Sequence, residues 1–479
     1  MTEHDRYVSP LSTRYASTAM QQLWSAKRRA RLWRELWLAL AEEQQKLGLE
    51  IPDSALEEIR AHLDDVDLDK VREYEQRFRH DVMAHIHALG DLAPSARPFL
   101  HLGATSAFVT DNSEAIVIRE AMGIVLGRLV MVLRALESFA LRMAAAPTVA
   151  YTHFQPAQLT TVGKRATLWL HDFYLDAIGI RDAIETMVCR GCKGTTGTQA
   201  SYLDLFHGDH EKVRQLDQAL ATRIGFSGSI AVCGQTYSRK LDSRVLALLS
   251  GVAQSASKFA TDLRLLQHED EVLEPTESEQ IGSSAMAYKR NPMRAERICA
   301  LARHLMALET NAVHTAATQW LERTLDDSAN RRISLPEAFL AADAVLILCT
   351  NVAGGLQVNE AVLARNVSRV MPFMATERWL MLGVQAGSDR QTLHEVIRRH
   401  SRAVSEAMAN GAENDLLERL AADEAFSGVD ADALRAELDP TRYIGRAPEQ
   451  VREFSEGPLK GLYETLTQYE APDEAKVTL

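Results

Sequence analysis

Apolar residues recur at helical spacing along most of the chain, and short polar segments separate these stretches. In the stretch that ends at His268, for example, Leu246, Leu249, Val252 and Ala256 fall on one helix face. We find no convincing alternation of apolar and polar residues of the kind that strands show. The pattern therefore predicts an all-α protein, with helices over residues 20–47, 54–63, 67–89, from the 101–114 cap region to 146, 156–190, 209–223, 240–268, 292–320 and 332–356, and shorter amphipathic helices from 359 onwards.

Residues typical of helix ends support several of these boundaries. Gly48 and Gly90 follow the last apolar positions of two helices, and Pro156 is placed to open another. Ser54 and Glu57 have the spacing of a capping box, in which each side chain bonds a backbone amide of the first turn. We expect these residues to begin and end the helices concerned.

The lengths of the predicted helices indicate three helical regions. Helices of roughly 30 residues span about 45 Å, which is longer than one compact domain needs. Such lengths are typical of a helix bundle, often one that other subunits complete. We predict an N-terminal helical domain over 1–105, a central long-helix bundle carrying oligomerisation and the catalytic loop over 106–358, and a C-terminal helical domain over 359–479.

Composition narrows the functional classes. The formal charge of -12 argues against a general nucleic-acid or membrane-surface binder, although a local basic pocket stays compatible with it. The N-terminal residues do not show the charged and then apolar pattern of a signal segment. No apolar run approaches the ~18–20 residues that span a bilayer. Five scattered cysteines, among them the pair Cys189 and Cys192, favour reduced thiols over disulfides, a metal site or a redox motif. We expect a cytoplasmic protein.

The most informative segment for chemistry is 280–297, QIGSSAMAYKRNPMRAER. It combines small flexible residues, two hydroxyls, two cations and a carboxamide, and Pro292 then suits the first turn of the next helix. Cations near a helix N-terminus bind carboxylates well, and a mobile loop can close over a substrate. A solvated loop between two helices is the alternative that composition alone leaves open.

Three other polar segments also fall at ends of long helices. They cover residues 101–106, 151–158 and 193–201. In an antiparallel bundle, loops at alternate helix ends lie far apart within one subunit. We therefore infer that an active site made from these loops would combine several subunits.

The motifs in these segments resemble a known enzyme superfamily. HLGATS, THFQPAQ and GSSAMAYKRNP, in this order, resemble the fumarase/aspartase superfamily, whose members eliminate fumarate or a related group. RHDVMAH, GQTYSRK and TLDDSANRR are more specific and resemble the adenylosuccinate lyase family of the animal type. The resemblance implies a homotetramer in which three subunits build each site, without a metal or an organic cofactor. It also implies β-elimination of fumarate from adenylosuccinate, giving AMP, and from SAICAR, giving AICAR, in purine nucleotide biosynthesis.

The resemblance also assigns catalytic roles. Eliminating fumarate needs a base for a weakly acidic C–H, cations for the intermediate and an acid for the departing nitrogen. Ser283 would be the base, activated by loop closure and Lys289, and His153 the acid, since histidine titrates near neutrality. Glu296 would orient the ring of His153. A simple loop hydroxyl at Ser283 and a capping role for His153 are the structural alternatives.

A larger set of residues matches positions that bind substrate. His80 could bind phosphate or a carboxylate or share in proton transfer, but packing beside Ala84 and His87 on one face of the 67–89 helix is the alternative. For the arginines taken singly, surface salt bridges are the alternative. The resemblance implies as substrate-binding residues Arg14, Tyr15, Arg79, His80, Asp81, Thr105, Ser106, Gln235, Lys289, Asn291, Arg297, Arg323, Ser328 and Arg332.

One position departs from the family pattern, and two rival functions stay open. Ala287 stands where the family usually has Pro, so the rigidity of the loop is in doubt, although no catalytic group is lost. A sister lyase acting on argininosuccinate, fumarate or aspartate is one rival, but those substrates carry no phosphate for Arg323 and Arg332. A structural protein that kept the scaffold without catalysis is the other.

Overall fold

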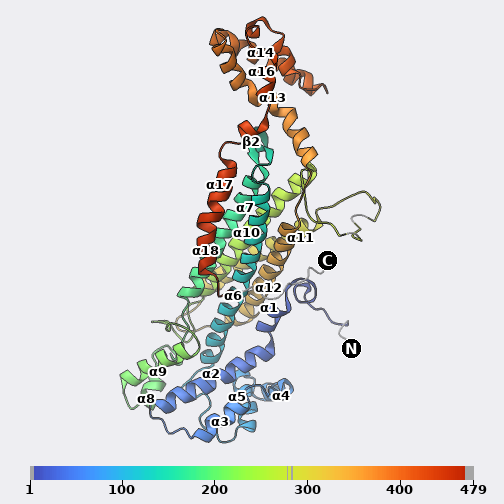
Figure 1. Cartoon of the computed structure of the whole chain (residues 1–479). Coiled ribbons are helices and arrows are strands. Elements are labelled where there is room, and N and C mark those ends of the chain that lie inside the picture. Colours follow the sequence, from blue (N-terminus) through green and yellow to red (C-terminus); the bar gives the residue numbers. More distant parts are fainter. Residues whose placement is uncertain (1–4, 278, 282–283, 470–479) are drawn as a thin grey trace.

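The computed structural model describes residues 5–277, 279–281 and 284–469 and has an elongated shape (Figure 1). A bundle of long helices forms the middle of the molecule. The N-terminal helices lie at one end, together with α8 (Ala200–Leu205) and α9 (His210–Arg223), and the helices between residues 360 and 436 lie towards the other. The predicted all-α class is confirmed, since the described strands form only two small two-stranded sheets.

The central bundle contains the five very long helices that the apolar pattern predicts. Their buried faces share one continuous core, in which Leu126, Phe173, Phe259 and Val345 are fully buried. The helices are α6 (Ser106–Arg142), α7 (Val162–Thr186), α10 (Lys240–His268), α11 (Met293–Ala317) and α12 (Asp326–Gly354). Helix α6 runs from the N-terminal helices at its start to the segment before α7 at its end, so it connects two distant parts of the molecule.

The N-terminal helices are more broken than the apolar pattern predicts. Ser25 divides the first predicted helix, since its hydroxyl caps the second half by accepting the N–H of Arg28. The predicted capping box of Ser54 is wrong, because Pro52 is the N-cap and no side chain bonds there. The elements are η2 (Leu11–Tyr15), α1 (Thr18–Leu23), α2 (Ala26–Lys46), α3 (Asp53–Ala61), α4 (Leu68–Phe78) and α5 (Asp81–Leu92).

A β-hairpin stands between α6 and α7, where the sequence analysis expected a loop and the first turns of a helix. Strands β1 (Pro147–Thr152) and β2 (Gln155–Thr161) pair antiparallel. Thr161, not Pro156, caps α7, because its hydroxyl accepts the N–H of Lys164. The segment is rich in Thr, Val and Tyr, which suit a pleated surface, so β propensity outweighs the helix-start signal of Pro156.

The C-terminal part has its own small core and then returns to the bundle. In Figure 1, α17 and α18 run alongside α7. Between the long helices, β3 (Val272–Leu273) pairs with β4 (Gln357–Val358). The remaining elements are α13 (Glu360–Gln385), α14 (Arg390–Ala409), α15 (Leu416–Ala421), η3 (Glu424–Phe426), α16 (Ala431–Ala436), η4 (Pro440–Tyr443), α17 (Ala447–Phe454), η5 (Ser455–Leu459) and α18 (Lys460–Thr465).

One expectation about apolar runs needs correction. Helix α12 contains an 18-residue window with a mean hydropathy of 1.7, so among the described helices it has the length and composition to cross a membrane. However, 78% of that window is buried inside the molecule. Its apolar character belongs to the core of the bundle.

Candidate active site

A cavity of about 840 Å³ lies at the end of the bundle where α6 and α12 begin. Its walls come from α2, the α4–α5 junction, the first turns of α6 and α12, and the segments that precede α10 and α12. Segments more than 200 residues apart in the sequence thus meet here. Of the predicted substrate-binding residues, eight line this cavity: Arg79, His80, Asp81, Ser106, Gln235, Arg323, Ser328 and Arg332.

The backbone between α4 and α5 places His80 in the cavity. Arg79 ends α4 with a left-handed φ of 55°, and His80 then becomes the N-cap of α5. The His80 Nδ1 accepts the N–H of Met83 at 3.2 Å, and its Nε2 lies 3.5 Å from the hydroxyl of Ser106. Because Nδ1 accepts, the neutral ring carries its proton on Nε2, on the side of the cavity.

The expected helical face shared by His80, Ala84 and His87 is therefore wrong. His80 caps a helix start, while Ala84 is fully buried and His87 packs its ring against Phe78 at a centroid distance of 4.6 Å. The break at Arg79 is the physical reason, since it divides the predicted 67–89 helix in two. Thr105 is the N-cap of α6, beside Ser106.

The cavity combines positive and negative side chains. Arg332 pairs with Asp81 at 3.1 Å, and Arg323 pairs with Asp327 at 2.8 Å. Ser328 lies in the first turn of α12, whose positive dipole end favours anions. Guanidinium groups beside a helix N-terminus are suited to bind a phosphate.

Several lining residues were not among the predicted ones. Some lie inside the quoted motifs, Arg239 in GQTYSRK and Asp327 in TLDDSANRR, so the motifs held the signal and the choice among their charged residues was incomplete. The unpredicted charged or aromatic lining residues are Arg29, Trp33, Glu75, Asp111, Glu114, Arg239, Asp327 and Arg331.

A second group of predicted residues lies near the start of α11. The guanidinium of Arg297 lies 5.6 Å from the centre of the Tyr15 ring, and that of Arg14 lies 5.9 Å from it. Lys289 is exposed and precedes Asn291 and α11. Arg14 and Arg297 thus place two cations against one aromatic ring.

The loop that carries this group is held by polar contacts at its end. The side chain of Gln267 donates to the carbonyl of Arg290 at 3.2 Å. Glu274 caps α11, since its carboxylate accepts the N–H groups of Arg294 and Ala295 at 3.0 and 2.9 Å. The proposed base, Ser283, lies outside the described residues.

His153 forms a third group on its own. It occupies, with Phe154, the two-residue turn between Thr152 and Gln155, which pair as the last rung of the hairpin. Their φ angles of 52° and 59° are those of a type I′ turn. His153 is exposed at the tip, and within one chain the structure shows no hydrogen bond between it and Glu296, both of which are described residues.

The geometry of α6 keeps the first and third groups apart. Ser106 at its start lines the cavity, and the hairpin begins soon after its end at Arg142. A helix of 37 residues is about 55 Å long at 1.5 Å per residue. Figure 1 shows the hairpin and α4–α5 on opposite ends of the bundle. Within one chain His153 cannot meet His80.

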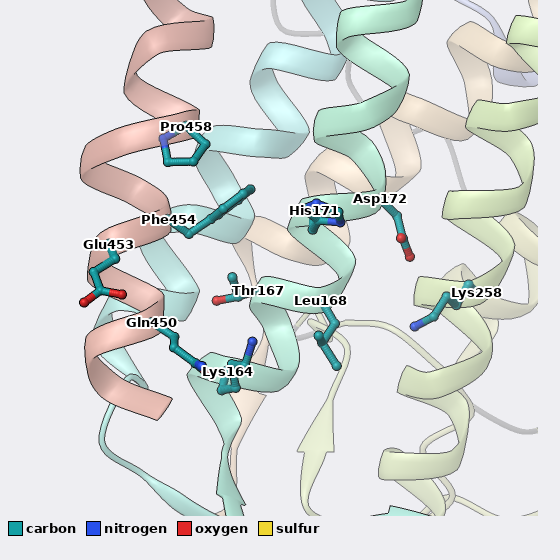
Figure 2. A pocket seen from close by; sticks show the side chains of 10 residues that line it. All are labelled: Lys164, Thr167, Leu168, His171, Asp172, Lys258, Gln450, Glu453, Phe454 and Pro458. Atoms are coloured by element: carbon teal, nitrogen blue, oxygen red, sulfur yellow. The ribbon is translucent and has the colours of Figure 1, made fainter. Parts of the chain in front are cut away.

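A separate cavity of about 770 Å³ lies on the side of the bundle and contains none of the predicted residues (Figure 2). Lys164, Leu168 and His171 of α7 line one wall, and Lys258 of α10 and Phe454 of α17 line others. His171 lies beside Phe454, with ring centroids 5.7 Å apart. In the part of the chain that is described, no group of three His, Cys, Asp or Glu side chains could hold a metal ion.

Two family models match most of the chain. A family model described as lyase matches residues 6–307, and one described as adenylosuccinate lyase C-terminus matches residues 372–454. Adenylosuccinate lyase of Saccharomyces cerevisiae is 47% identical over 100% of both chains. That of Schizosaccharomyces pombe is 47% identical, and that of Schistosoma mansoni 45%, each over 95% of both chains.

Solved structures show the same fold at lower identity. A 3-carboxy-cis,cis-muconate lactonizing enzyme from Pseudomonas putida superimposes with a TM-score of 0.81 at 22% identity, covering 95% of this chain and 99% of that one. A fumarate lyase from Mesorhizobium sp. BNC1 gives a TM-score of 0.78 at 24% identity, covering 93% and 99%. The arrangement of long helices is therefore shared beyond the relatives named above.

Proposed function

Since the chain belongs to the adenylosuccinate lyase family, we propose that it cleaves adenylosuccinate to AMP and fumarate. We propose the same elimination from SAICAR, which gives AICAR and fumarate. The observation that carries this proposal is the arginine-rich cavity, because eight residues assigned to substrate by the motifs line it together. Arg323 and Arg332, beside the N-terminus of α12, suit the phosphate that both substrates carry.

The elimination divides its tasks among the three groups of residues. Lys289 and Asn291 would hold the succinyl carboxylates and the negative charge that develops after proton removal. Ser283 would take the carbon-bound proton, and His153 would protonate the leaving nitrogen. Exposure of His153 at a hairpin tip supports this role, since it can reach a substrate held elsewhere.

The separation of the cavity from the hairpin tip supports a site shared between chains. We propose a homotetramer in which three subunits contribute to each site, the cavity coming from one, the loop before α11 from another and the hairpin tip from a third. Leu168 and Leu175 on α7 and Leu265 on α10 are 50%, 53% and 44% exposed. Leu168 lines the cavity of Figure 2, and exposed leucines on α7 and α10 favour coverage of these helices by another copy.

Cellular location and other partners follow from composition rather than from the site. We propose a cytoplasmic enzyme, in keeping with its scattered cysteines, whose partners are its small-molecule substrates and further copies of the same chain. The formal charge of -12 argues against nucleic acid and membrane surfaces as partners.

The test is an assay on purified protein without added metal. Adenylosuccinate is added, and the loss of its ultraviolet absorbance is followed together with fumarate and AMP release. Equal amounts of both products would support the proposal, and potent inhibition by AMP would support the nucleotide assignment. If AMP does not inhibit, a sister lyase is favoured, and argininosuccinate, fumarate and aspartate are then assayed as substrates. If the folded tetramer turns over none of these compounds, a non-catalytic scaffold is favoured.

A further inference from the structure

Three of the side chains that line the cavity form a buried chain of charges that joins three helices of the bundle. Arg239, immediately before α10, donates to both oxygens of Asp111 on α6 at 3.3 and 3.1 Å. Its Nε donates to Asp327 on α12 at 2.7 Å. These three side chains are at most 2% exposed, so solvent does not weaken the ion pairs.

The chain of charges continues into the cavity through Arg323. Its Nη1 donates to the second oxygen of Asp327 at 2.8 Å. Asp327 therefore uses one oxygen for a fully buried arginine and the other for an arginine that is 24% exposed and lines the cavity. Burial alone would raise the pKa of Asp327, but Arg239 and Arg323 outweigh this and lower it, so the carboxylate is charged at neutral pH.

We propose that Asp327 is a positioning residue for substrate binding, which fixes the Arg323 guanidinium against the Asp111–Arg239 pair so that it meets the substrate phosphate already oriented. This inference rests on the proposed function. A long arginine side chain loses much rotamer freedom when it binds, and a partner that holds it beforehand removes that cost. The bond to Asp327 uses Nη1 of a group that has five N–H donors, so the guanidinium can still bind an anion.

The bond between Asp327 and Arg239 explains why a carboxylate suits position 327 better than a neutral group. Arg239 holds Asp327 through a guanidinium that is itself held by Asp111 on another helix. The Asp327 side chain thus cannot follow Arg323 if that residue moves. Replacing the carboxylate by an amide weakens both bonds, since charged hydrogen bonds are stronger than neutral ones.

The test compares two ligands that differ only by the phosphate, AMP and adenosine. In Asp327→Asn we expect the dissociation constant of AMP, measured by calorimetry, to rise about ten- to a hundredfold. The dissociation constant of adenosine should change less than twofold. For adenylosuccinate, KM should rise more than kcat falls, because the loss concerns binding of a part of the substrate that does not react.

A matched control is available in the C-terminal part of the chain. Glu437 is 8% exposed and also lies between two arginines, Arg378 at 3.3 Å and Arg442 at 2.8 Å. The Glu437→Gln variant loses a comparable buried charge outside the cavity. It should lower the melting temperature and leave the ratio of AMP to adenosine affinity unchanged.

A double-mutant cycle then distinguishes positioning of Arg323 from a general loss of structure. If Asp327 acts through Arg323, AMP should bind Arg323→Ala and the double variant Arg323→Ala/Asp327→Asn equally weakly. Full additivity of the two losses would overturn the inference, as would equal losses for AMP and adenosine in Asp327→Asn. Asp327→Glu provides a second variant with the charge kept but displaced, and normal AMP affinity there would also count against positioning.

Turnover of adenylosuccinate by the wild-type protein is measured in the same preparation. Absent turnover together with a selective loss of AMP binding in Asp327→Asn would overturn the proposed reaction and support the positioning role. Normal turnover with unchanged AMP binding in Asp327→Asn would overturn the positioning role alone.

Discussion

Left-handed backbone conformations occur at two candidate site residues, Arg79 and His153, and at Phe154 beside His153. Their φ angles of 55°, 52° and 59° belong to a region that costs a side-chain-bearing residue about 1–2 kcal/mol. Such costs persist where the surrounding structure holds the conformation, and they cluster at functional sites. At Arg79 the left-handed turn frees His80 to cap α5, and at His153 it carries the ring to the tip of the hairpin.

Replacing His153 tests the proposed general acid. For His153→Gln we expect fumarate release to fall by about 10²- to 10⁴-fold, because proton transfer to the leaving nitrogen loses its catalyst. The measurement is kcat with adenylosuccinate, together with the melting temperature. His207→Gln is the matched control, since His207 is also exposed with a left-handed φ of 54°. A similar loss of rate in both variants would contradict the assigned role.

Asp176 on α7 should make the stability of the protein depend on pH. Burial, and then the neighbouring charge of Asp172, raise its pKa to about 7, although a hydrogen bond from Ser255 acts in the opposite direction. The folded protein therefore binds a proton between about pH 4 and 7 that the unfolded chain releases. This contribution to stability is fully present below pH 4 and is lost as the pH rises to about 7.

The Asp176→Asn variant isolates this effect. Above pH 7 it should be more stable than the wild type by several kcal/mol, since each unit of pKa corresponds to about 1.4 kcal/mol. The difference should disappear below about pH 4, where Asp176 is protonated in both states. Denaturant unfolding of both proteins at a series of pH values provides the measurement. A difference that does not vary with pH would show that Asp176 is charged in the fold.

At the level of helices and strands, the apolar pattern predicts the long elements well and the short ones poorly. Helix α10 ends at His268 as predicted, because an uninterrupted apolar stripe defines a buried face. The hairpin was missed because a proline that often opens helices here lies within a strand, opposite Tyr151. The break at Arg79 was missed because nothing in its residue type favours a left-handed conformation.

The close approach of the start of α7 to the end of α6 depends on Gly163. A Cβ atom at this position would lie 2.6 Å from the Cα of Ala144 and would also meet the carbonyl of Ala140. These are backbone atoms, which cannot move aside as a flexible side chain can. Gly163→Ala should therefore separate the two helices and lower the unfolding free energy by about 1–3 kcal/mol through overpacking.

Gly123→Ala on α6 is the control for this prediction. A Cβ atom there would meet only the Tyr469 ring, at 3.9 Å. Because alanine is the better helix former, this variant should be more stable by about 0.5–1 kcal/mol. Thermal unfolding of both variants provides the measurement. Equal stability of the two would mean that the bundle adjusts to a wider crossing.

How the parts of the site combine is a property of the whole molecule, which sequence reasoning could only outline. The motifs predicted which residues bind substrate, and many of the predicted residues line one cavity. They could not indicate which buried groups hold those residues, because Asp327 acts through contacts with segments distant in the sequence. The domain boundaries at 105 and 358 and the roles of individual site residues stay predictions.

The shared site makes a prediction about mixtures of two inactive proteins. His153 and Arg323 lie in groups that one chain keeps apart, so His153→Gln and Arg323→Ala should each inactivate a different part of every site. If the two homotetramers are dissociated, mixed in equal amounts and reassembled, a site can receive its hairpin from one variant and its cavity from the other. Random assembly then makes about a quarter of the sites intact in a closed symmetric oligomer.

If each site takes its hairpin tip and its cavity from different chains, activity on adenylosuccinate should return to about a quarter of the wild-type value. The control mixes His153→Gln protein with itself through the same dissociation and reassembly, which should restore nothing. A mixture of His153→Gln with Glu437→Gln shows how much activity reassembly itself preserves. Failure of the first mixture, where this second one regains activity, would mean that one chain supplies both His153 and Arg323 to each site, and the three-subunit arrangement would have to be abandoned.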